Sequence, residues 1–180
     1  MDKKIKQIFV TGGAGFIGSH VCARLLNLGY GVVSLDNFNS FYDPQIKAKN
    51  VEQIRALPSA GEFYHSLRGD IRDADLIGEI LAQFQPEAVI HLAAMAGVRP
   101  SIEDPLLYTD VNIRGTQILL EACAKRSLRS FLFASSSSVY GNNKKLPFAE
   151  SDNVDYPISP YAATKKAGEL LCHTYAHLHG

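Results

Sequence analysis

Two side chains with complementary acid-base chemistry, Tyr161 and Lys165, stand four residues apart directly after Ser159-Pro160. Serine followed by proline is typical of a helix start, and a spacing of four residues brings both side chains to one face of that helix. A phenol is mostly protonated at neutral pH, but a neighbouring ammonium group favours the phenolate. The pair therefore predicts that Tyr161 removes a proton from a hydroxyl group with the help of Lys165. Lys166 points to a different helix face and suits this role less.

A run of four hydroxyl-bearing residues, Ser135-Ser136-Ser137-Ser138, follows an apolar segment of strand length. In a parallel sheet, ligands bind outside the carboxyl ends of the strands, so one of these hydroxyls is expected to hold a substrate oxygen beside Tyr161. A tyrosine and a lysine at this spacing are common on helix surfaces without any catalytic role. The catalytic interpretation therefore depends on a glycine-rich turn found much earlier in the chain.

That turn is Thr11-Gly12-Gly13-Ala14-Gly15-Phe16-Ile17-Gly18, which follows an apolar segment and opens into an amphipathic one. Gly12 allows a tight turn from strand to helix, Gly15 lets the backbone approach a pyrophosphate, and Gly18 permits close packing of the helix on the strand. The free N–H groups at the start of the helix, together with its dipole, favour an anion there. We therefore interpret the turn as a dinucleotide-binding site.

An acidic residue, Asp36, stands 18 residues beyond Gly18 at the end of the next predicted strand. A carboxylate at this place accepts hydrogen bonds from the ribose hydroxyls of adenosine and repels a 2′-phosphate, so NAD is favoured over NADP. The alternative is an ordinary glycine turn and a strand-end aspartate without any ligand. The order of strand, turn, helix and acid favours the nucleotide site.

Two further segments follow predicted strands. Gly69-Asp70-Ile71 offers an aspartate that could bind the adenine amine, and the small residues of His91-Leu92-Ala93-Ala94-Met95-Ala96-Gly97 leave room for a flat cofactor. Either segment could equally be a helix cap or a tight turn. His91 ends an apolar strand, so we expect it to be a hydrogen-bonded structural histidine.

Apolar segments of strand length alternate with longer segments of helical period, which is the pattern of βαβ units and a mostly parallel sheet. We therefore predict an α/β fold with a doubly wound parallel sheet. The predicted strands are Gln7–Val10, Gly31–Leu35, Glu62–Leu67, Ala88–His91 and Ser130–Ala134. The predicted helices are Gly15–Leu28, Gln45–Ala56, Asp73–Phe84, Leu106–Lys125 and Pro160–Leu178. Residues 141–157 are polar, contain proline and glycine, and predict a long surface loop.

The composition is that of one domain spanning residues 1–180, since 180 residues with 46% hydrophobic side chains can bury one core. Lys plus Arg and Asp plus Glu both count 18, so we expect no nucleic-acid or membrane partner. The N-terminus holds no apolar run long enough for a signal peptide or a membrane span. Three widely spaced cysteines, Cys22, Cys123 and Cys172, indicate packing residues rather than disulfides, and hence a reducing cytoplasm.

Taken in order, these motifs resemble the extended short-chain dehydrogenase/reductase family, which contains nucleotide-sugar epimerases, along essentially the whole chain. The resemblance implies a Rossmann-type domain that binds NAD. It places the catalytic hydroxyl on Ser136, 25 residues before Tyr161, and makes Asn112 a cofactor contact. The full set of cofactor contacts that it implies is Gly12, Gly15, Phe16, Ile17, Gly18, Asp36, Asn37, Asp70, Ile71, Leu92, Ala93, Ala94, Asn112, Tyr161 and Lys165.

Two strings indicate the kind of nucleotide sugar. Residues 36–44 (Asp-Asn-Phe-Asn-Ser-Phe-Tyr-Asp-Pro) and 95–99 (Met-Ala-Gly-Val-Arg) are similar to those of UDP-glucuronate 4-epimerases and related capsule-sugar enzymes. Related dehydratases carry an Asp-Glu pair beside the catalytic hydroxyl to eliminate water, and Ser137-Ser138 stand there instead. We hypothesise that Ser137 and Ser138 hydrogen-bond a sugar carboxylate, with Arg99 as a further substrate contact.

The reaction that the resemblance implies is an epimerisation at C4 of the sugar. Tyr161 takes the proton of the 4-hydroxyl while hydride passes to NAD, Ser136 hydrogen-bonds the same oxygen, and hydride then returns to the other face of the keto sugar. A decarboxylase or a dehydrogenase of the same superfamily would share the cofactor residues. A non-catalytic NAD-binding protein would keep the glycine turn but would not need Ser136, Tyr161 and Lys165, so their presence favours an enzyme.

Proteins of this family continue beyond the Tyr-xxx-Lys helix into another strand and a smaller substrate domain. This chain ends at Gly180, 15 residues after Lys165, so we expect the substrate domain to be largely absent and an apolar sheet edge to be left uncovered. In the resembling enzymes the helices at 106–125 and 160–178 form a dimer surface, which implies a homodimer. The three histidines near the C-terminus lack a completing carboxylate or cysteine, so we interpret them as solvated rather than as a metal site.

Overall fold

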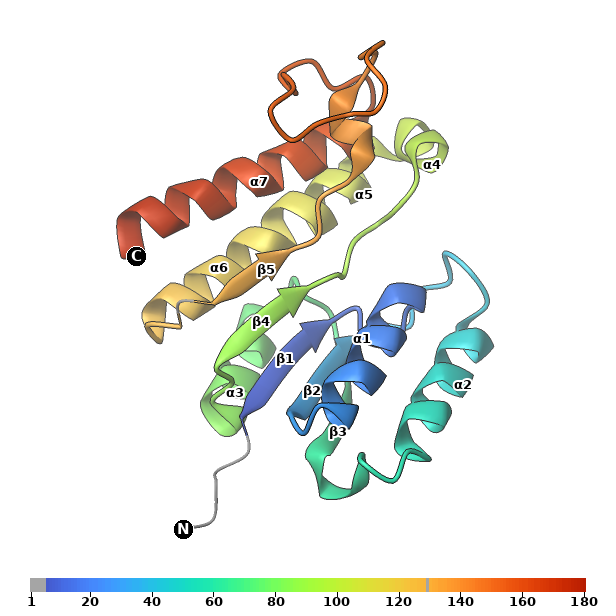
Figure 1. Ribbon diagram of the computed structural model, residues 1–180, viewed down its shortest axis with the longest axis vertical. Coiled ribbons are helices and arrows are strands. Elements are labelled where there is room, and N and C mark those ends of the chain that lie inside the picture. The colour runs from blue at the N-terminus through green and yellow to red at the C-terminus, as the bar shows by residue number, and fades with distance from the viewer. Residues whose placement is uncertain (1–5, 129) are drawn as a thin grey trace.

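Five parallel strands form one sheet in the computed structural model, which describes residues 6–128 and 130–180 (Figure 1). Their order across the sheet is β3-β2-β1-β4-β5. The strands are β1 (Gln7–Thr11), β2 (Gly31–Asp36), β3 (Tyr64–Arg68), β4 (Ala88–His91) and β5 (Phe131–Phe133). The chain therefore starts in the middle of the sheet, runs outward to β3 and returns through β4 to β5. This is the doubly wound arrangement predicted from the sequence.

Helices connect these strands. They are α1 (Phe16–Asn27), α2 (Pro44–Arg55), α3 (Ala74–Phe84), α4 (Val98–Glu103), α5 (Pro105–Tyr108), α6 (Gly115–Lys125) and α7 (Pro160–His179). Two short 3-10 turns, η1 (Gly61–Phe63) and η3 (Ser137–Tyr140), and a π-helical segment, η2 (Thr109–Arg114), lie between them. The chain after β5 ends in α7, which packs on α6 and on β5.

Side chains and proline set the starts of several helices. Asp43 accepts a hydrogen bond from Gln45 N at the start of α2, and Ser159 accepts one from Ala162 N at the start of α7. Each cap satisfies a backbone N–H that has no partner within its own helix. Pro160 follows Ser159 in the first turn, so the helix start predicted at Ser159-Pro160 is confirmed.

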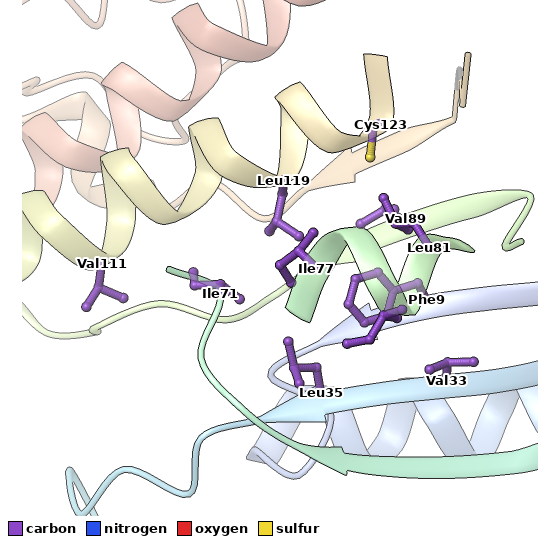
Figure 2. Close-up of a cluster of buried hydrophobic side chains, with 11 residues drawn as sticks. Phe9, Val33, Leu35, Ile71, Ile77, Leu81, Val89, Val111, Leu119 and Cys123 are labelled. Carbon is purple, nitrogen blue, oxygen red and sulfur yellow. The ribbon is translucent and has the colours of Figure 1, made fainter. Parts of the chain in front are cut away.

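One face of the sheet is covered by α3 and α6 (Figure 2). Phe9 of β1, Val33 of β2 and Val89 of β4 pack there against Ile77 of α3 and Leu119 of α6, and all five side chains are fully buried. Complete burial of such a side chain contributes about 1.5–3 kcal/mol to stability. This layer therefore holds β1, β2 and β4 in place, and a doubly wound sheet binds ligands at the carboxyl ends of its strands.

The opposite face is covered by α1 and α2. Val10 and Val32 point to this face, where they pack with Cys22 and Leu26 of α1 and Ile54 of α2. Successive strand residues thus alternate between the two faces, as the pleat of a β-strand requires. Because both faces are covered, β1 and β2 appear in the sequence as nearly continuous apolar runs.

All five predicted strands are present, and β4 has its predicted bounds. The prediction that a strand begins at Glu62 was wrong. Gly61 has φ of 37°, and Phe63 N donates to Ala60 O, which winds residues 61–63 into η1 before β3 begins. The prediction for β5 was one residue too long at each end.

The helix predicted over residues 106–125 is present without a break, but its middle, η2, is π-helical, which the sequence did not predict. Within η2, the side chain of Asn112 bonds Met95 N at 2.8 Å, Met95 O at 3.0 Å and Thr164 Oγ1 at 3.0 Å. These partners are distant in sequence, so a local pattern could not reveal them. The short α4, which contains Arg99, was not predicted either.

The far edge of the sheet carries exposed apolar surface. Leu132 of β5 is 55% exposed, which agrees with the uncovered edge expected from the sequence. Residues 141–157, all of them described, contain neither helix nor strand, so the predicted loop is confirmed. Among the helices within residues 6–128 and 130–180, none combines the length and the apolar character needed to cross a bilayer.

Candidate active site

A cleft of about 280 Å³ opens at the carboxyl edge of the sheet, outside the ends of β1 to β4. Its walls come from the glycine turn, from the acidic strand ends and from the segment after β4. The predicted cofactor residues that line it are Gly12, Gly15, Phe16, Ile17, Gly18, Asp36, Asn37, Asp70, Ile71, Leu92, Ala93 and Ala94. The cleft lies where the chain switches from β1 to β4, the position at which doubly wound sheets bind ligands.

The glycine turn closes tightly against its neighbours. Gly12 has φ of +72°, and a Cβ on it would lie 2.8 Å from Ala93 N, so a side chain has neither a relaxed conformation nor space there. A Cβ on Gly18 would collide with the Gly12 carbonyl oxygen. Gly12 N donates to Leu35 O at 2.7 Å, which ties the turn to the end of β2. The roles predicted for Gly12 and Gly18 agree with these contacts.

The start of α1 faces the cleft without a protein partner for its positive end. The cap residue is Gly15, and among the described residues no side chain caps this helix and no acid stands in its first turn. The Tyr42 hydroxyl also lines the cleft, where it is buried without a hydrogen-bond partner among the described residues. Burial, reinforced by the charge of Asp36, raises the pKa of Tyr42. Unpaired N–H groups and an orphaned hydroxyl fit a polar anionic ligand such as a pyrophosphate.

Asp36 at the end of β2 forms a buried ion pair with Lys47 of α2. Lys47 Nζ donates to Asp36 Oδ1 at 3.0 Å, and both side chains are less than 10% exposed. Phe38 N donates to the same oxygen at 2.8 Å. Within residues 6–128 and 130–180 no donor reaches Asp36 Oδ2, which leaves an acceptor for a ribose hydroxyl.

Asp70 lies on the other side of the same wall. It accepts hydrogen bonds from Arg72 and, at 3.1 Å, from Asn37 Nδ2. The guanidinium of Arg72 holds the pKa of the Asp70 carboxyl well below its usual range. The carboxylate is therefore charged at neutral pH and able to accept a hydrogen bond from a bound base.

His91 is the hydrogen-bonded structural histidine that the sequence predicted. Its side chain is almost completely buried, Nδ1 bonds Thr11 Oγ1 at 2.7 Å and Nε2 bonds Thr116 Oγ1 at 2.9 Å. Burial, and then the charge of Lys165, lower the pKa of His91 to about 3, so the ring is neutral. Thr11 Oγ1 also accepts from Ala93 N at 3.2 Å, which positions part of the cleft floor.

Lys165 lies behind the cleft wall at the end of β5. It is 4% exposed, and its Nζ donates to the Ala134 carbonyl oxygen at 2.9 Å. Burial lowers the pKa of Lys165 to about 8. Ala134 itself lines the cleft, so the ammonium group is one residue removed from it.

Tyr161 stands one turn earlier on α7, as the spacing predicted. Its ring packs edge to face against Tyr108, with ring centroids 6.2 Å apart. Ser136 caps the start of η3, where its Oγ lies 2.9 Å from Ser138 Oγ and accepts from Ser138 N at 3.2 Å. The lining of the cleft, taken over the described residues, does not include Ser136, Tyr161 or Lys165. The structure places these three at the neighbouring strand end rather than in the cleft itself.

Four other predicted residues, Ser138 among them, also lie outside the cleft. Asn112 is 3% exposed and bonded to protein groups, so a direct cofactor contact stays a prediction. Ser137 and Arg99 are exposed, and no contact within the described residues tests their predicted roles toward a substrate.

The family model described as GDP-mannose 4,6 dehydratase matches residues 9–180. The chain belongs to this family. Membership agrees with the extended short-chain dehydrogenase/reductase motifs in the sequence.

Several relatives of this dehydratase-family chain are epimerases by name. UDP-glucuronate 4-epimerase 1 of Arabidopsis thaliana is 48% identical over 175 residues, which cover 97% of this chain and 40% of the relative. Protein CapI of Staphylococcus aureus is 42% identical over 173 residues, covering 96% of this chain and 50% of the relative. The chain therefore spans half or less of the length of these two relatives.

Solved structures give the same fold with a bound dinucleotide. UDP-glucuronic acid 4-epimerase from Bacillus cereus, in complex with UDP-glucuronic acid and NAD, is 39% identical with a TM-score of 0.85. The match covers 96% of this chain and 53% of that one. UDP-glucose 4-epimerase from Brucella ovis, in complex with NAD, is 36% identical with a TM-score of 0.82, over 97% of this chain and 49% of that one.

Sequence reasoning missed several residues of the site of this dehydratase-family member. Lys47 and Tyr42 line the cleft, and Arg72 binds Asp70 behind it. The available signal was weak: Lys47 is a lysine on the buried side of a helix, and Arg72 directly follows Asp70-Ile71. In the described part of the chain, no three histidine, cysteine, aspartate or glutamate side chains come together as metal ligands would.

Proposed function

We propose that residues 1–180 form the NAD-binding and catalytic domain of a nucleotide-sugar 4-epimerase that acts on UDP-glucuronate. The observation that carries the proposal is the cleft in which the glycine turn, Asp36 and Asp70 meet from three strand ends. A dinucleotide uses such groups together, at its pyrophosphate, its ribose and its base. The epimerase structures from Bacillus cereus and Brucella ovis, both in complex with NAD, support the same assignment.

NAD fits the groups that the cleft presents. The N–H groups at Phe16 and Ile17 face a pyrophosphate, and Asp36 Oδ2 accepts from the ribose hydroxyls. The carboxylate of Asp36 repels a phosphate on the 2′-hydroxyl of that ribose, which selects NAD over NADP. When bound, NAD takes up and returns the hydride of the sugar C4.

Residues of this chain remove and return the proton of the sugar 4-hydroxyl. Tyr161 takes this proton and later gives it back, and the Lys165 ammonium group stabilises the phenolate. With a pKa of about 8, Lys165 is still mostly protonated at neutral pH. Ser136 donates a hydrogen bond to the reacting oxygen, for which it exchanges its present contact with Ser138.

The carboxylate of glucuronate is assigned to Ser137 and Ser138, with Arg99 as a further contact. Hydroxyl donors bind a carboxylate through charge-assisted hydrogen bonds. A Ser137→Ala, Ser138→Ala double variant is expected to raise the KM for UDP-glucuronate and to leave the Kd of NAD unchanged. An unchanged KM would contradict the assignment of the carboxylate.

The decisive experiment measures NAD binding and UDP-glucuronate turnover on this chain and on the longest product of its gene. NAD binding with conversion to UDP-galacturonate, without net NADH formation, is the expected result for the longer product. Net accumulation of NADH or release of carbon dioxide would instead indicate a dehydrogenase or a decarboxylase. No binding of NAD to either protein would overturn the proposal.

Three further assignments belong to the same proposal. A homodimer through residues 106–125 and 160–178 is supported by Leu106, Leu170 and Leu178, which are 80%, 56% and 65% exposed. Sedimentation of a Leu170→Glu variant tests it, and an unchanged dimer would contradict this surface. A reducing cytoplasmic location and a role in polysaccharide precursor synthesis are inferred from the free thiols and from the capsule-enzyme resemblance.

A further inference from the structure

An arginine behind the cleft, Arg72, forms a hydrogen-bonded ion pair with the carboxylate of Asp70. Its Nε donates to Asp70 Oδ1 and its Nη2 donates to Asp70 Oδ2, both at 2.9 Å. The backbone N–H of Arg72 also donates to Oδ1 at 2.9 Å. A planar guanidinium bound through two nitrogens fixes the position and the plane of a carboxylate. The lining of the cleft over the described residues includes Asp70 and does not include Arg72, so we assign Arg72 an effect on a bound molecule through Asp70.

Arg72 is itself anchored to a different element. Its Nη1 donates to Asp110 Oδ2 at 2.7 Å in η2, where Arg114 also donates to Asp110 Oδ1 at 3.1 Å. Hydrogen bonds from Arg72 are the main reason that the pKa values of Asp70 and Asp110 lie below their usual range. Both carboxylates are therefore charged at neutral pH, and the bridge from η2 to the cleft wall is maintained.

The remaining donor to Asp70 is the side-chain amide of Asn37. Asn37 Nδ2 donates to Asp70 Oδ2 at 3.1 Å, so the carboxylate accepts hydrogen bonds at about as many positions as its two oxygens offer. The bond from Asn37 is the one that does not come from Arg72, and it comes from a neutral group that lines the cleft. Charge-assisted bonds from a guanidinium are stronger than a bond from an amide. Asn37 is therefore the donor that an entering amine displaces.

We propose that Arg72 is a positioning residue that presents Asp70 Oδ2 to the exocyclic amine of a bound adenine, with the Asn37 amide occupying that acceptor until the base enters. This inference rests on the proposed NAD site and adds its base selectivity. The consequence is a preference for a base that carries an amine over one that lacks it, and the preference depends on Arg72.

The test compares the Kd of NAD with the Kd of an analogue in which unsubstituted purine replaces adenine, measured by isothermal titration calorimetry on this chain. In the wild type the analogue is expected to bind about tenfold more weakly, because its base offers no amine to Asp70 Oδ2 and the acceptor keeps its bond from Asn37 instead. In Arg72→Met the ratio of the two Kd values is expected to fall to about twofold or less, since Asp70 is no longer held in place. Arg72→Lys keeps the positive charge but cannot bind the carboxylate through two nitrogens, so the ratio of the two Kd values is expected to fall in this variant as well.

Arg114→Met is the matched control. It removes the same charge from the same partner, Asp110, and leaves every bond to Asp70 in place. Its ratio is expected to equal that of the wild type. Because the readout is a ratio, a uniform loss of affinity or of stability does not imitate the effect, and thermal unfolding of each variant verifies that it is folded.

The outcomes separate this inference from the proposed function. A wild-type ratio retained in both Arg72 variants would overturn the role of Arg72 and leave the NAD site standing. A ratio of Kd values near one in the wild type would show that Asp70 does not bind the amine of adenine. This result would also overturn the inference and leave the NAD site standing. Failure of the wild-type chain to bind either dinucleotide would overturn the NAD site, and the role of Arg72 with it.

Discussion

Around the glycine turn, the cleft is formed by the backbone. Beyond β5, the side chains expected to take part in catalysis are hydrogen-bonded to other groups of the protein. Gly12 leaves no room for a side chain, and the turn is closed by its bond to Leu35. Lys165 and Ser136, by contrast, are bonded to Ala134 and Ser138. Binding is therefore built into the fold, while chemistry requires side chains to exchange a protein partner for a substrate.

The two regions also differ in how they are packed. β1 and β2 are covered on both faces, but Leu132 of β5 is more than half exposed. Substitutions on the glycine side are therefore expected to change stability and cofactor affinity together. Loss of the Ser136 or Tyr161 hydroxyl on the catalytic side is expected to change turnover while NAD affinity remains.

The largest expected effect is that of Tyr161→Phe on turnover. Loss of the hydroxyl that we propose transfers the proton is expected to lower kcat about 1000-fold, while the Kd of NAD changes by less than about twofold. Steady-state kinetics and calorimetry on the active gene product measure the two quantities. Tyr156→Phe is the control, since Tyr156 is 81% exposed and far less constrained. An equal loss of NAD affinity in Tyr161→Phe would erase the distinction between the two regions.

On the glycine side, Gly18→Ala is expected to lower the free energy of unfolding by about 3 kcal/mol and to abolish NAD binding. The added Cβ would collide with the Gly12 carbonyl, which is backbone and cannot rotate away. Gly78→Ala in α3 is the matched control, because nothing lies within 4 Å of its added Cβ. Helix propensity predicts that this control gains about 0.5–1 kcal/mol. Urea unfolding that shows similar changes in both variants would contradict the close packing of the turn.

Burial of Lys165 gives the catalytic side a signature in the pH dependence of stability. The pKa of Lys165 is about 8 in the folded chain against 10.5 for a free lysine side chain, so the unfolded chain binds this proton more tightly. Lys165 is therefore expected to contribute a rise in stability of about 2–3 kcal/mol between pH 8 and 10.5. This contribution is opposite in sign to that of the three thiols, whose pKa values are raised by burial, and Lys165→Met should remove the Lys165 contribution from the pH profile. Lys166→Met, on a neighbouring face of α7, should retain it. A rise that persists in Lys165→Met would mean that another group is responsible.

The smallest expected effect concerns the choice between NAD and NADP. Asp36→Asn removes the charge that repels a 2′-phosphate and leaves the Lys47 ammonium group nearby. The ratio of Kd values for NADP and NAD is expected to fall about tenfold, which corresponds to 1.4 kcal/mol. Calorimetry with both dinucleotides measures it, and Asp43→Asn, at the exposed cap of α2, serves as control. An unchanged ratio would show that Asp36 does not face the ribose.

The glycine side could be predicted well because its signals are local. Gly12, Gly18 and Asp36 follow from a strand, a turn and a helix read in order, and β4 was placed correctly from one apolar run. What could not be predicted depends on distant partners. The buried Lys47 pairs with Asp36, and the π-helical segment is held by bonds from Asn112 to Met95 and Thr164.

The catalytic side was predicted in type but not in detail. The helix carrying Tyr161 and Lys165 starts where Ser159-Pro160 predicted, because a cap and a proline are local features. Their distance from the cleft depends on how β5 and α7 pack, which spacing along the chain does not encode. The roles of these residues therefore remain predictions, whereas the assembly of the glycine turn with the strand-end acids is a property of the fold.

The most direct test of that assembly is an NMR titration of the ¹⁵N-labelled chain with NAD. We predict that the largest amide shifts fall on residues 15–18, on Asp36 and on Asp70-Ile71, with saturation at one equivalent of NAD. Shifts that are absent, or that cluster away from these three strand ends, would contradict the claim that they form one dinucleotide site.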